Sequence, residues 1–304
     1  MTLRSFGSVL ALAAALVAQD PRRSPPPAPG GAAPRTAQQQ VERLLTAVRD
    51  GDAVALWDWL PPSYQQDVEG LAHALANRVD AKTWNRGAKL LHRLAAAAAA
   101  KQQFVFGNRT VADQLRRNGT DARSVQAAWT ALTQLLQQLA TSDLGSVEGL
   151  RDFDGRAFTQ RSGTALLETV FALARASGHD PLADLDAVQV RTVGQQGGEV
   201  RIELDSPQRG TEVTTFVQVE GRWLPAPMAR GWQDGIAELH DRLAALPHGG
   251  DARTAAQAGL LLGALEGFVK QLEDVESQAD FDALCTRTLQ MLAPRPEATP
   301  ARHG

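Results

Sequence analysis

The sequence predicts an α+β fold that is mainly helical and contains one small antiparallel sheet. Apolar and polar residues alternate with a period of two, as in half-buried strands, only between residues 187 and 224. Elsewhere the apolar residues recur at helical spacing. We therefore expect a β-meander of three or four strands, with its apolar face covered by helices from both sides of the sequence.

The strands are predicted from their alternating residues and from the turns between them. We expect a loose loop from Gly194 to Gly198, a second turn from Ser206 to Gly210, and a tight two-residue turn at Glu220-Gly221. The alternating positions are Val188, Val190, Val200, Ile202, Leu204, Val213, Thr215, Val217 and Val219.

The first 18 residues have the layout of a secretory signal peptide. One positive charge at Arg4 precedes the apolar run from Val9 to Val17, and small residues follow. This run is too short to span a bilayer, so we expect export to the periplasm or the extracellular space rather than anchoring. Cleavage after Ala15 and cleavage after Ala18 both stay open.

The chain divides into four segments by composition. After the signal peptide, residues 19–35 contain six prolines and predict a disordered, proline-rich tether. Residues 36–292 carry the periodic patterns of a single helix-rich α+β domain, since the sheet is too small to be stable alone. Residues 293–304 predict a disordered tail.

Capping residues predict where the first helices begin and end. Thr36 is expected to cap a helix that stops at Gly51, and Asp52 to cap a short helix that ends before Pro61. Ser63 and Gln66 have the spacing of a capping box for a third helix.

Longer helices follow on both sides of the sheet. Asp80 is expected to cap a fourth helix with Trp84, Ala88, Leu91 and Leu94 on its apolar stripe. The clearest helix runs from about Asp121 to Ala140, and further helices lie after the sheet. The apolar stripe of residues 121–140 consists of Val125, Ala128, Trp129, Leu132, Leu135, Leu136 and Leu139.

Two stretches resemble the NTF2-like, cone-shaped α+β domains of uncharacterised exported bacterial proteins. The first is VERLLTAVRDGDAVALWDWLPPSYQQDV, a helix, a Gly-Asp turn and a second helix, and the other is the hairpin TTFVQVEGRWLP. The resemblance implies a curved sheet around a pocket, in which some members of the family carry out isomerase or dehydratase chemistry with paired carboxylates. About a hundred helical residues stand where the first hairpin of such a cone is expected.

The sequence contains no pattern typical of a metal, cofactor or nucleophilic site. The six histidines form no HxxxH, HxH or HExxH pattern, and GxSxG, S-x-x-K and phosphate-binding loops are absent. The net charge of -3, without a basic run, excludes nucleic acid as the expected partner. We therefore expect no cofactor and no metal.

Two groups of acidic residues are interpreted as structural rather than as ligand or catalytic sites. His179, Asp180, Asp184 and Asp186 lie together, but Asp before Pro favours a turn over a calcium site. Glu199, Glu203 and Asp205 alternate with the apolar positions of a strand, so we expect them on the solvent face rather than in a pocket.

Trp57, Trp59 and Tyr64 are the candidate binding rim. These rings flank a Pro-Pro break, and two residues two positions apart on a helix cannot both face the same core. The one cysteine, Cys285, is expected to be a buried small apolar residue, because no cation or helix start lies beside it in the sequence.

The pattern favours a non-catalytic exported protein that binds a partner or a small apolar ligand in the cell envelope. One alternative is an isomerase- or hydrolase-type enzyme with a cone pocket, which a desolvated acid or histidine in a deep pocket would indicate. The other alternative is a helical assembly subunit. A large exposed apolar face on helices 121–140 or 254–275 would indicate that class.

Overall fold

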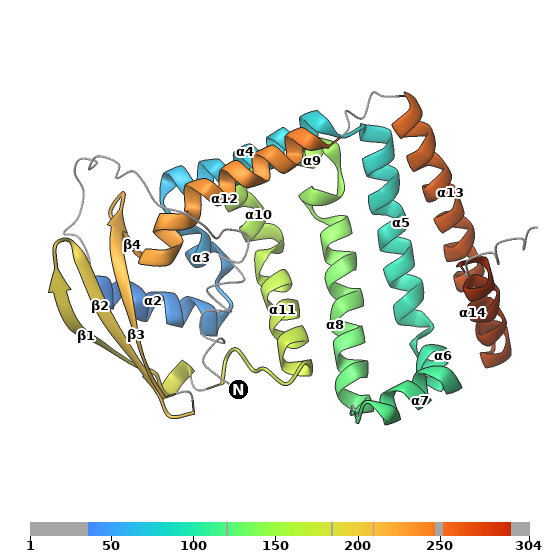
Figure 1. Ribbon diagram of the computed structural model, residues 1–304, viewed down its shortest axis with the longest axis horizontal. Helices are drawn as coiled ribbons and strands as arrows, with labels where there is room; N and C mark the ends of the chain where they lie inside the picture. Colours follow the sequence, from blue (N-terminus) through green and yellow to red (C-terminus); the bar gives the residue numbers. More distant parts are fainter. Residues whose placement is uncertain (1–35, 120, 184, 209, 247–251, 293–304) are drawn as a thin grey trace, which may run out of the picture.

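The computed structural model describes residues 36–119, 121–183, 185–208, 210–246 and 252–292. A small sheet with its covering helices occupies one end of the molecule, and a row of helices extends from it to the other end (Figure 1). Most described residues are helical, which confirms the predicted fold class. The predicted signal peptide, tether and tail lie outside the described residues.

The sheet is an antiparallel meander of four strands in the order β1-β2-β3-β4. Its strands are β1 (Gln189–Gln196), β2 (Glu199–Ser206), β3 (Gly210–Val219) and β4 (Arg222–Pro225). Glu220 and Gly221 both have positive φ, 47° and 78°, as a two-residue hairpin turn with the right-handed strand twist requires. The predicted tight turn is therefore confirmed.

The loose loop predicted from Gly194 to Gly198 is wrong. Strand β1 continues to Gln196, which pairs with Glu199, and only Gly197 and Gly198 form the turn. Both glycines adopt positive φ, so the hairpin closes over two residues. The register of β1 is irregular between Thr192 and Gly194, where Val193 is the extra residue of a β-bulge.

Helices from both flanks of the sequence cover one face of the sheet, as predicted. Helix α2 (Ala37–Asp50) packs Ala37 and Val41 against Ile202 and Phe216, which are almost completely buried. Helix α12 (Ala226–Ala245) follows β4 directly. It shares a second buried cluster with α2, α3 and α4, made of Leu44, Trp59, Tyr64, Leu224, Met228, Trp232 and Ile236.

The predicted ends of the first helices are confirmed, with one exception. Thr36 and Gln39 form a capping box at the start of α2, and Gly51 ends that helix in the left-handed conformation. Asp52 caps α3 (Ala53–Trp59) through the Ala55 N–H.

The capping box predicted at Ser63 is wrong. Helix α4 (Pro62–Arg78) begins at Pro62, and Pro61 at its N-cap makes no side-chain hydrogen bond. The Ser63 N–H instead donates to Glu220 Oε2 at 3.1 Å, so a carboxylate from the β3–β4 turn accepts at the helix start.

The row of helices is one layer in the order α11, α8, α5, α13 (Figure 1). Its members are α5 (Ala81–Ala100), α8 (Ala122–Thr141), α11 (Thr164–Ala176) and α13 (Ala252–Glu273), and α14 (Gln278–Leu292) packs at the end of the row. Asp80 and Asp121 cap α5 and α8 as their spacing predicts.

Short helices connect the layer and join it to the sheet. They are α6 (Gln102–Gly107), α7 (Arg109–Arg117), η1 (Asp143–Gly145), α9 (Val147–Arg151), α10 (Gly155–Phe158), the π-helical turn η2 (Thr159–Gly163) and η3 (Leu185–Ala187). In the part of the chain that the structure describes, no helix combines the length and the apolar character of a membrane span.

Candidate functional site

Two of the three predicted rim aromatics are core residues. Trp59 and Tyr64 are buried in the cluster that joins α2, α3, α4 and α12. The Tyr64 ring stacks on Trp232 with ring centroids 4.1 Å apart, and Trp232 Nε1 donates to Asp67 Oδ2 at 2.7 Å. These contacts tie α4 to α12 and leave neither ring at the surface. Placing Trp59 and Tyr64 on a rim was therefore a wrong prediction.

Trp57 is the one residue of the predicted rim that is not buried. It is half-buried, and its ring passes so close to Gly155 that a Cβ there would lie 2.1 Å from Trp57 Cζ2. The prediction of a binding rim in this segment therefore rests on Trp57.

Burial changes the chemistry of Tyr64. Loss of hydration raises the pKa of Tyr64 to about 12, and the negative charges of Asp67 and Glu220 add to the rise. A phenol with this pKa stays protonated at neutral pH, so Tyr64 has no use there as a base.

The acidic residues of β2 lie on the solvent face of the sheet, as predicted. Arg191 reaches Glu203 at 2.9 Å and Asp205 at 3.5 Å, and Arg230 reaches Glu199 at 3.1 Å. Glu203 and Asp205 alternate with the buried Ile202 and Leu204 and pair along the sheet, whereas Glu199 is exposed at the start of β2 and pairs with α12, so the three acids do not converge on a pocket.

The segment with His179 and Asp180 is a turn, as predicted. Asp180 Oδ1 accepts from the Leu182 N–H at 3.0 Å, which is an Asx turn, and His179 Nδ1 lies 3.1 Å from Ser177 O. Asp186 pairs with Arg49 at 3.1 Å, and Asp184 lies outside the described residues. No group of three potential metal ligands occurs among the residues whose positions are described.

Cys285 is half-buried in the cluster between α13 and α14, with Phe281 and Leu284. Burial, and to a lesser extent Asp282, raises the pKa of the thiol, which disfavours the reactive thiolate. This agrees with the expected role of a small apolar residue.

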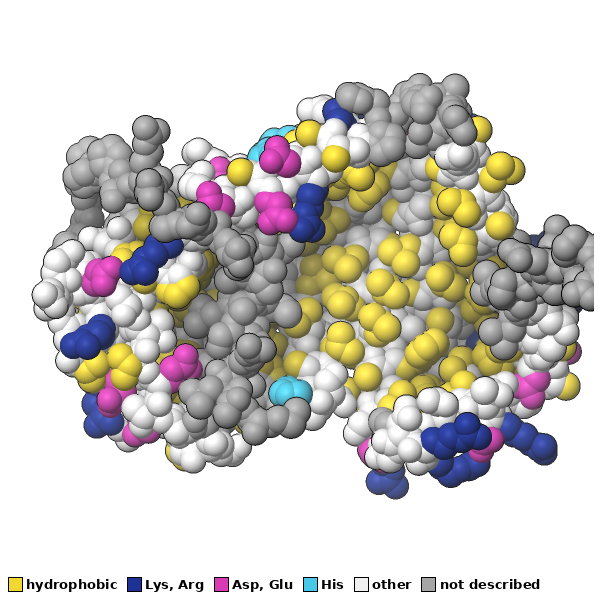
Figure 2. Space-filling view, viewed as in Figure 1, with side chains coloured by type: hydrophobic (Ala, Val, Ile, Leu, Met, Phe, Trp, Pro, Cys, Tyr) yellow, Lys and Arg dark blue, Asp and Glu magenta, His cyan; other side chains and the backbone are white. Residues whose placement is uncertain are grey.

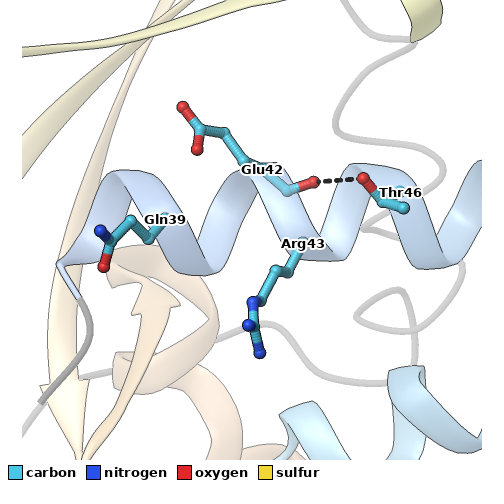
Figure 3. A pocket seen from close by; sticks show the side chains of 4 residues that line it. All are labelled: Gln39, Glu42, Arg43 and Thr46. Atoms are coloured by element: carbon cyan, nitrogen blue, oxygen red, sulfur yellow. Dashed lines mark hydrogen bonds between the residues drawn. The ribbon is translucent and has the colours of Figure 1, made fainter.

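A shallow depression lies along the outer side of α2. Figure 3 shows its lining, Gln39, Glu42, Arg43 and Thr46, all from this one helix, with the Thr46 hydroxyl donating to the Glu42 carbonyl. All four residues are exposed. A surface formed by one helix encloses nothing, so it offers no site for chemistry.

An exposed apolar surface lies on the helix layer, and it includes α8. Ala131 and Thr133 lie about 100° to either side of Leu132 around the helix, and both are buried. Leu132 stands at the centre of the apolar stripe and is 41% exposed. The flanks of α8 are therefore packed against neighbours while the centre of its apolar stripe is not.

The polar residues of α8 lie on the opposite side. Gln126, Thr130, Gln134 and Thr141 are all exposed. Trp129 Nε1 donates to Ala98 O of α5 at 3.1 Å, which fixes one flank of α8. Helix α8 thus has solvent access on both its polar and its apolar sides, as a helix in a single layer does.

Helix α5 continues the same surface. Its apolar stripe, centred on Leu91, lies opposite Lys89 and Arg93 around the helix. Ala95 on this stripe is buried, and Leu91 itself is half-buried.

Helix α13 is held parallel to α5 by two bidentate ion pairs. Arg86 binds Glu266 through contacts of 2.6 Å and 2.6 Å, and Arg93 binds Glu273 through contacts of 3.0 Å and 2.6 Å. The two arginines are seven residues apart on α5, and the two glutamates are seven residues apart on α13. The two ion pairs therefore fix the register of α13 against α5. Lys101 Nζ also donates to Val275 O at 2.5 Å.

Although α13 is fixed in the layer, large leucines on it are exposed. Leu261 is 68% and Leu265 47% exposed. Toward its C-terminal end the same stripe continues through Phe268 and Leu272, which α14 and α6 cover. The uncovered part is the half that α14 does not reach.

Helical geometry places Leu91, Leu132 and Leu265 on one side of the layer. Figure 2 shows hydrophobic side chains gathered over α8, α5 and α13. We call this surface the apolar face. Its residues are Leu132, Leu136 and Leu139 of α8, Leu91 of α5, and Leu261 and Leu265 of α13, of which Leu132, Leu261 and Leu265 are exposed and the others half-buried.

The three helix patterns were visible in the sequence, but the open side was not. Each stripe predicts burial, whereas the single layer leaves Leu132 of α8 and Leu261 and Leu265 of α13 exposed. No model of a known family, no curated protein sequence and no solved structure matches the chain, so the apolar face has to be interpreted from its own geometry. The NTF2-like resemblance accordingly stays a prediction.

Proposed function

We propose that the protein is a non-catalytic assembly protein of the cell envelope that binds a protein partner through the apolar face. The observation that carries this proposal is the exposure of Leu132 on α8 and of Leu261 and Leu265 on α13, two helices that hydrogen bonds tie to α5. A contiguous apolar surface of this kind marks an interaction site in soluble proteins. Export is part of the proposal and rests on the pattern of residues 1–18.

The shape of the apolar face favours a protein over a small apolar ligand. Ligand sites are concave and cover most of the ligand's surface. The side chains over α8, α5 and α13 instead form a broad surface that three parallel or antiparallel helices present together (Figure 2). Such a surface is matched by another extended surface.

The enzyme alternative has less support from the described residues. Glu199, Glu203 and Asp205 are paired with arginines on the solvent face of the sheet. The sheet's buried side is filled by Phe216, Ile202 and the residues of α2, where a cone would have its pocket.

Site-specific photo-crosslinking in the producing cell tests the proposal. A photoreactive amino acid at position 132 or 265 is expected to give discrete crosslinked protein bands in the envelope fraction. The matched control is position 134, which is exposed on the polar side of α8 and should give none. Equal crosslinking at positions 132 and 134, or no band at either 132 or 265, contradicts the proposal.

A further inference from the structure

We infer that the apolar face is covered by the same face of a second copy of this chain, in a twofold symmetric dimer. The inference rests on the proposed function and specifies its partner. Three features of the face support it, namely its area, its lack of charge and the rigidity of the helix that carries its most exposed leucines.

The area matches what a dimer needs. Helices of about 20 residues are about 30 Å long and pack about 9 Å apart, so α8, α5 and α13 together present about 800 Å². Helices α14 and α6 cover the corner at the C-terminal end of α13. Two copies of the remaining area bury on the order of 1,200 Å², which is the lower end of the range of stable interfaces.

The face carries no charge at its centre. None of the residues within about 60° of Leu132 on α8, or of Leu91 on α5, is charged. Arginines and lysines of α5 lie on the other side of the layer, where Arg86 and Arg93 bind α13. Homodimer interfaces are more apolar than those between proteins that meet transiently, and a charge-free surface is complementary to itself.

Net charge does not oppose the association. The chain carries a formal net charge of -3 over 304 residues, which gives two copies only weak mutual repulsion.

The exposed leucines of α13 are not the result of a loose helix, because two bidentate ion pairs to α5 set its register. The apolar face therefore already has its structure in the single chain, before dimerisation.

Sedimentation equilibrium of the protein as purified from the producing cell, over a range of protein concentrations, tests this inference. The wild type is expected to have the mass of a dimer. Leu132→Glu and Leu265→Glu each place a carboxylate in the apolar face and should weaken dimerisation at least 100-fold, giving the mass of a monomer.

Leu260→Glu is the matched control. Leu260 is 76% exposed on the same helix, but it lies about 140° around the helix from Leu265 and so points away from the face. This variant should stay dimeric. Far-UV circular dichroism checks that every variant is folded, and Leu132→Gln and Leu265→Gln replace the glutamates if either variant unfolds.

The outcomes separate this inference from the proposed function. A wild type that is monomeric at all concentrations, or a dimer that resists the substitutions at both Leu132 and Leu265, overturns the dimer. If the wild type is monomeric while crosslinks in the cell still form at positions 132 and 265, the assembly role stands with a different protein as partner. If the dimer forms but no crosslink appears in the cell, the assembly role fails and the dimer is a property of the purified chain.

Discussion

The two ends of the molecule use apolar residues in opposite ways. At the sheet end, α2 and α12 close over one face, and Ile202, Phe216 and Leu224 are almost completely buried. In the helix layer, each helix packs sideways against its neighbours and leaves the stripe centred on Leu132 open. A sheet needs a second layer to complete its core, whereas a row of helices can satisfy its hydrogen bonds within each helix and stay one layer thick.

The largest difference in stability is expected between one truncated residue at the sheet end and one in the helix layer. Phe216→Ala removes a ring that is 2% exposed and should destabilise the chain by about 3–5 kcal/mol. Leu132→Ala should cost less than about 1 kcal/mol in the dilute monomer, because the leucine is already 41% exposed. Urea denaturation at low protein concentration measures both. Equal losses would contradict the distinction between a closed and an open core.

The junction between the two ends is tested at Gly155. An added Cβ would lie 2.1 Å from Trp57 Cζ2, so Gly155→Ala should destabilise by about 1–3 kcal/mol. The control is Gly70→Ala in α4, where no atom lies within 4 Å of the new methyl group. That change should be neutral or stabilising, because alanine favours the helix over the unfolded chain. Comparable losses at both positions would show that Trp57 does not pack against α10 as described.

The buried tyrosine gives the sheet end a dependence on alkaline pH. The folded state raises the pKa of Tyr64 from 10.0 to about 12, so the unfolded chain loses this proton first. The associated stability is fully present below pH 10 and is lost as pH rises toward 12. Tyr64→Phe should flatten this part of the curve of unfolding free energy against pH. An unchanged slope would mean that other groups cause it.

The smallest effect is expected at the ion pairs between α5 and α13. The Arg93 and Glu273 side chains are 45% and 37% exposed, so solvent screens their attraction. Arg93→Met should leave the global stability nearly unchanged but speed amide hydrogen exchange in α13, because the register of that helix is less restrained. Lys89→Met removes a charge from the exposed side of the same helix and serves as the control. Unaltered exchange in α13 with Arg93→Met would contradict the proposed restraint.

The sequence predicts elements well where their signals are local. Thr36, Asp52 and Asp80 cap helices with their own side chains, and the period of two located β1, β2 and β3 of the three or four strands expected. The start of α4 was misassigned at Ser63, because its hydrogen-bond acceptor is Glu220, more than 150 residues away. No pattern within one segment reports such a partner.

Contacts between residues far apart in the sequence also made the predicted binding rim wrong. Trp59 and Tyr64 flank a proline break, which favoured a surface position, but α12 returns over them and stacks Trp232 on Tyr64. Conversely, the stripe on residues 121–140 predicts burial for Leu132 because amphipathic helices usually meet a core. An apolar stripe is buried only if another element packs against it. Whether that happens depends on the number of layers in the fold, which is a property of tertiary packing.

The accessibility of one thiol in the cell tests the role of the apolar face most directly. In a Cys285→Ala background, Leu265→Cys and Leu260→Cys are labelled with a maleimide both in the producing cell and as dilute purified protein. The apolar face predicts that the thiol at position 265 is protected in the cell and reactive when dilute, while the thiol at position 260 reacts equally in both. Equal labelling of position 265 in the two settings would contradict the account, because the face would then be open where the protein works.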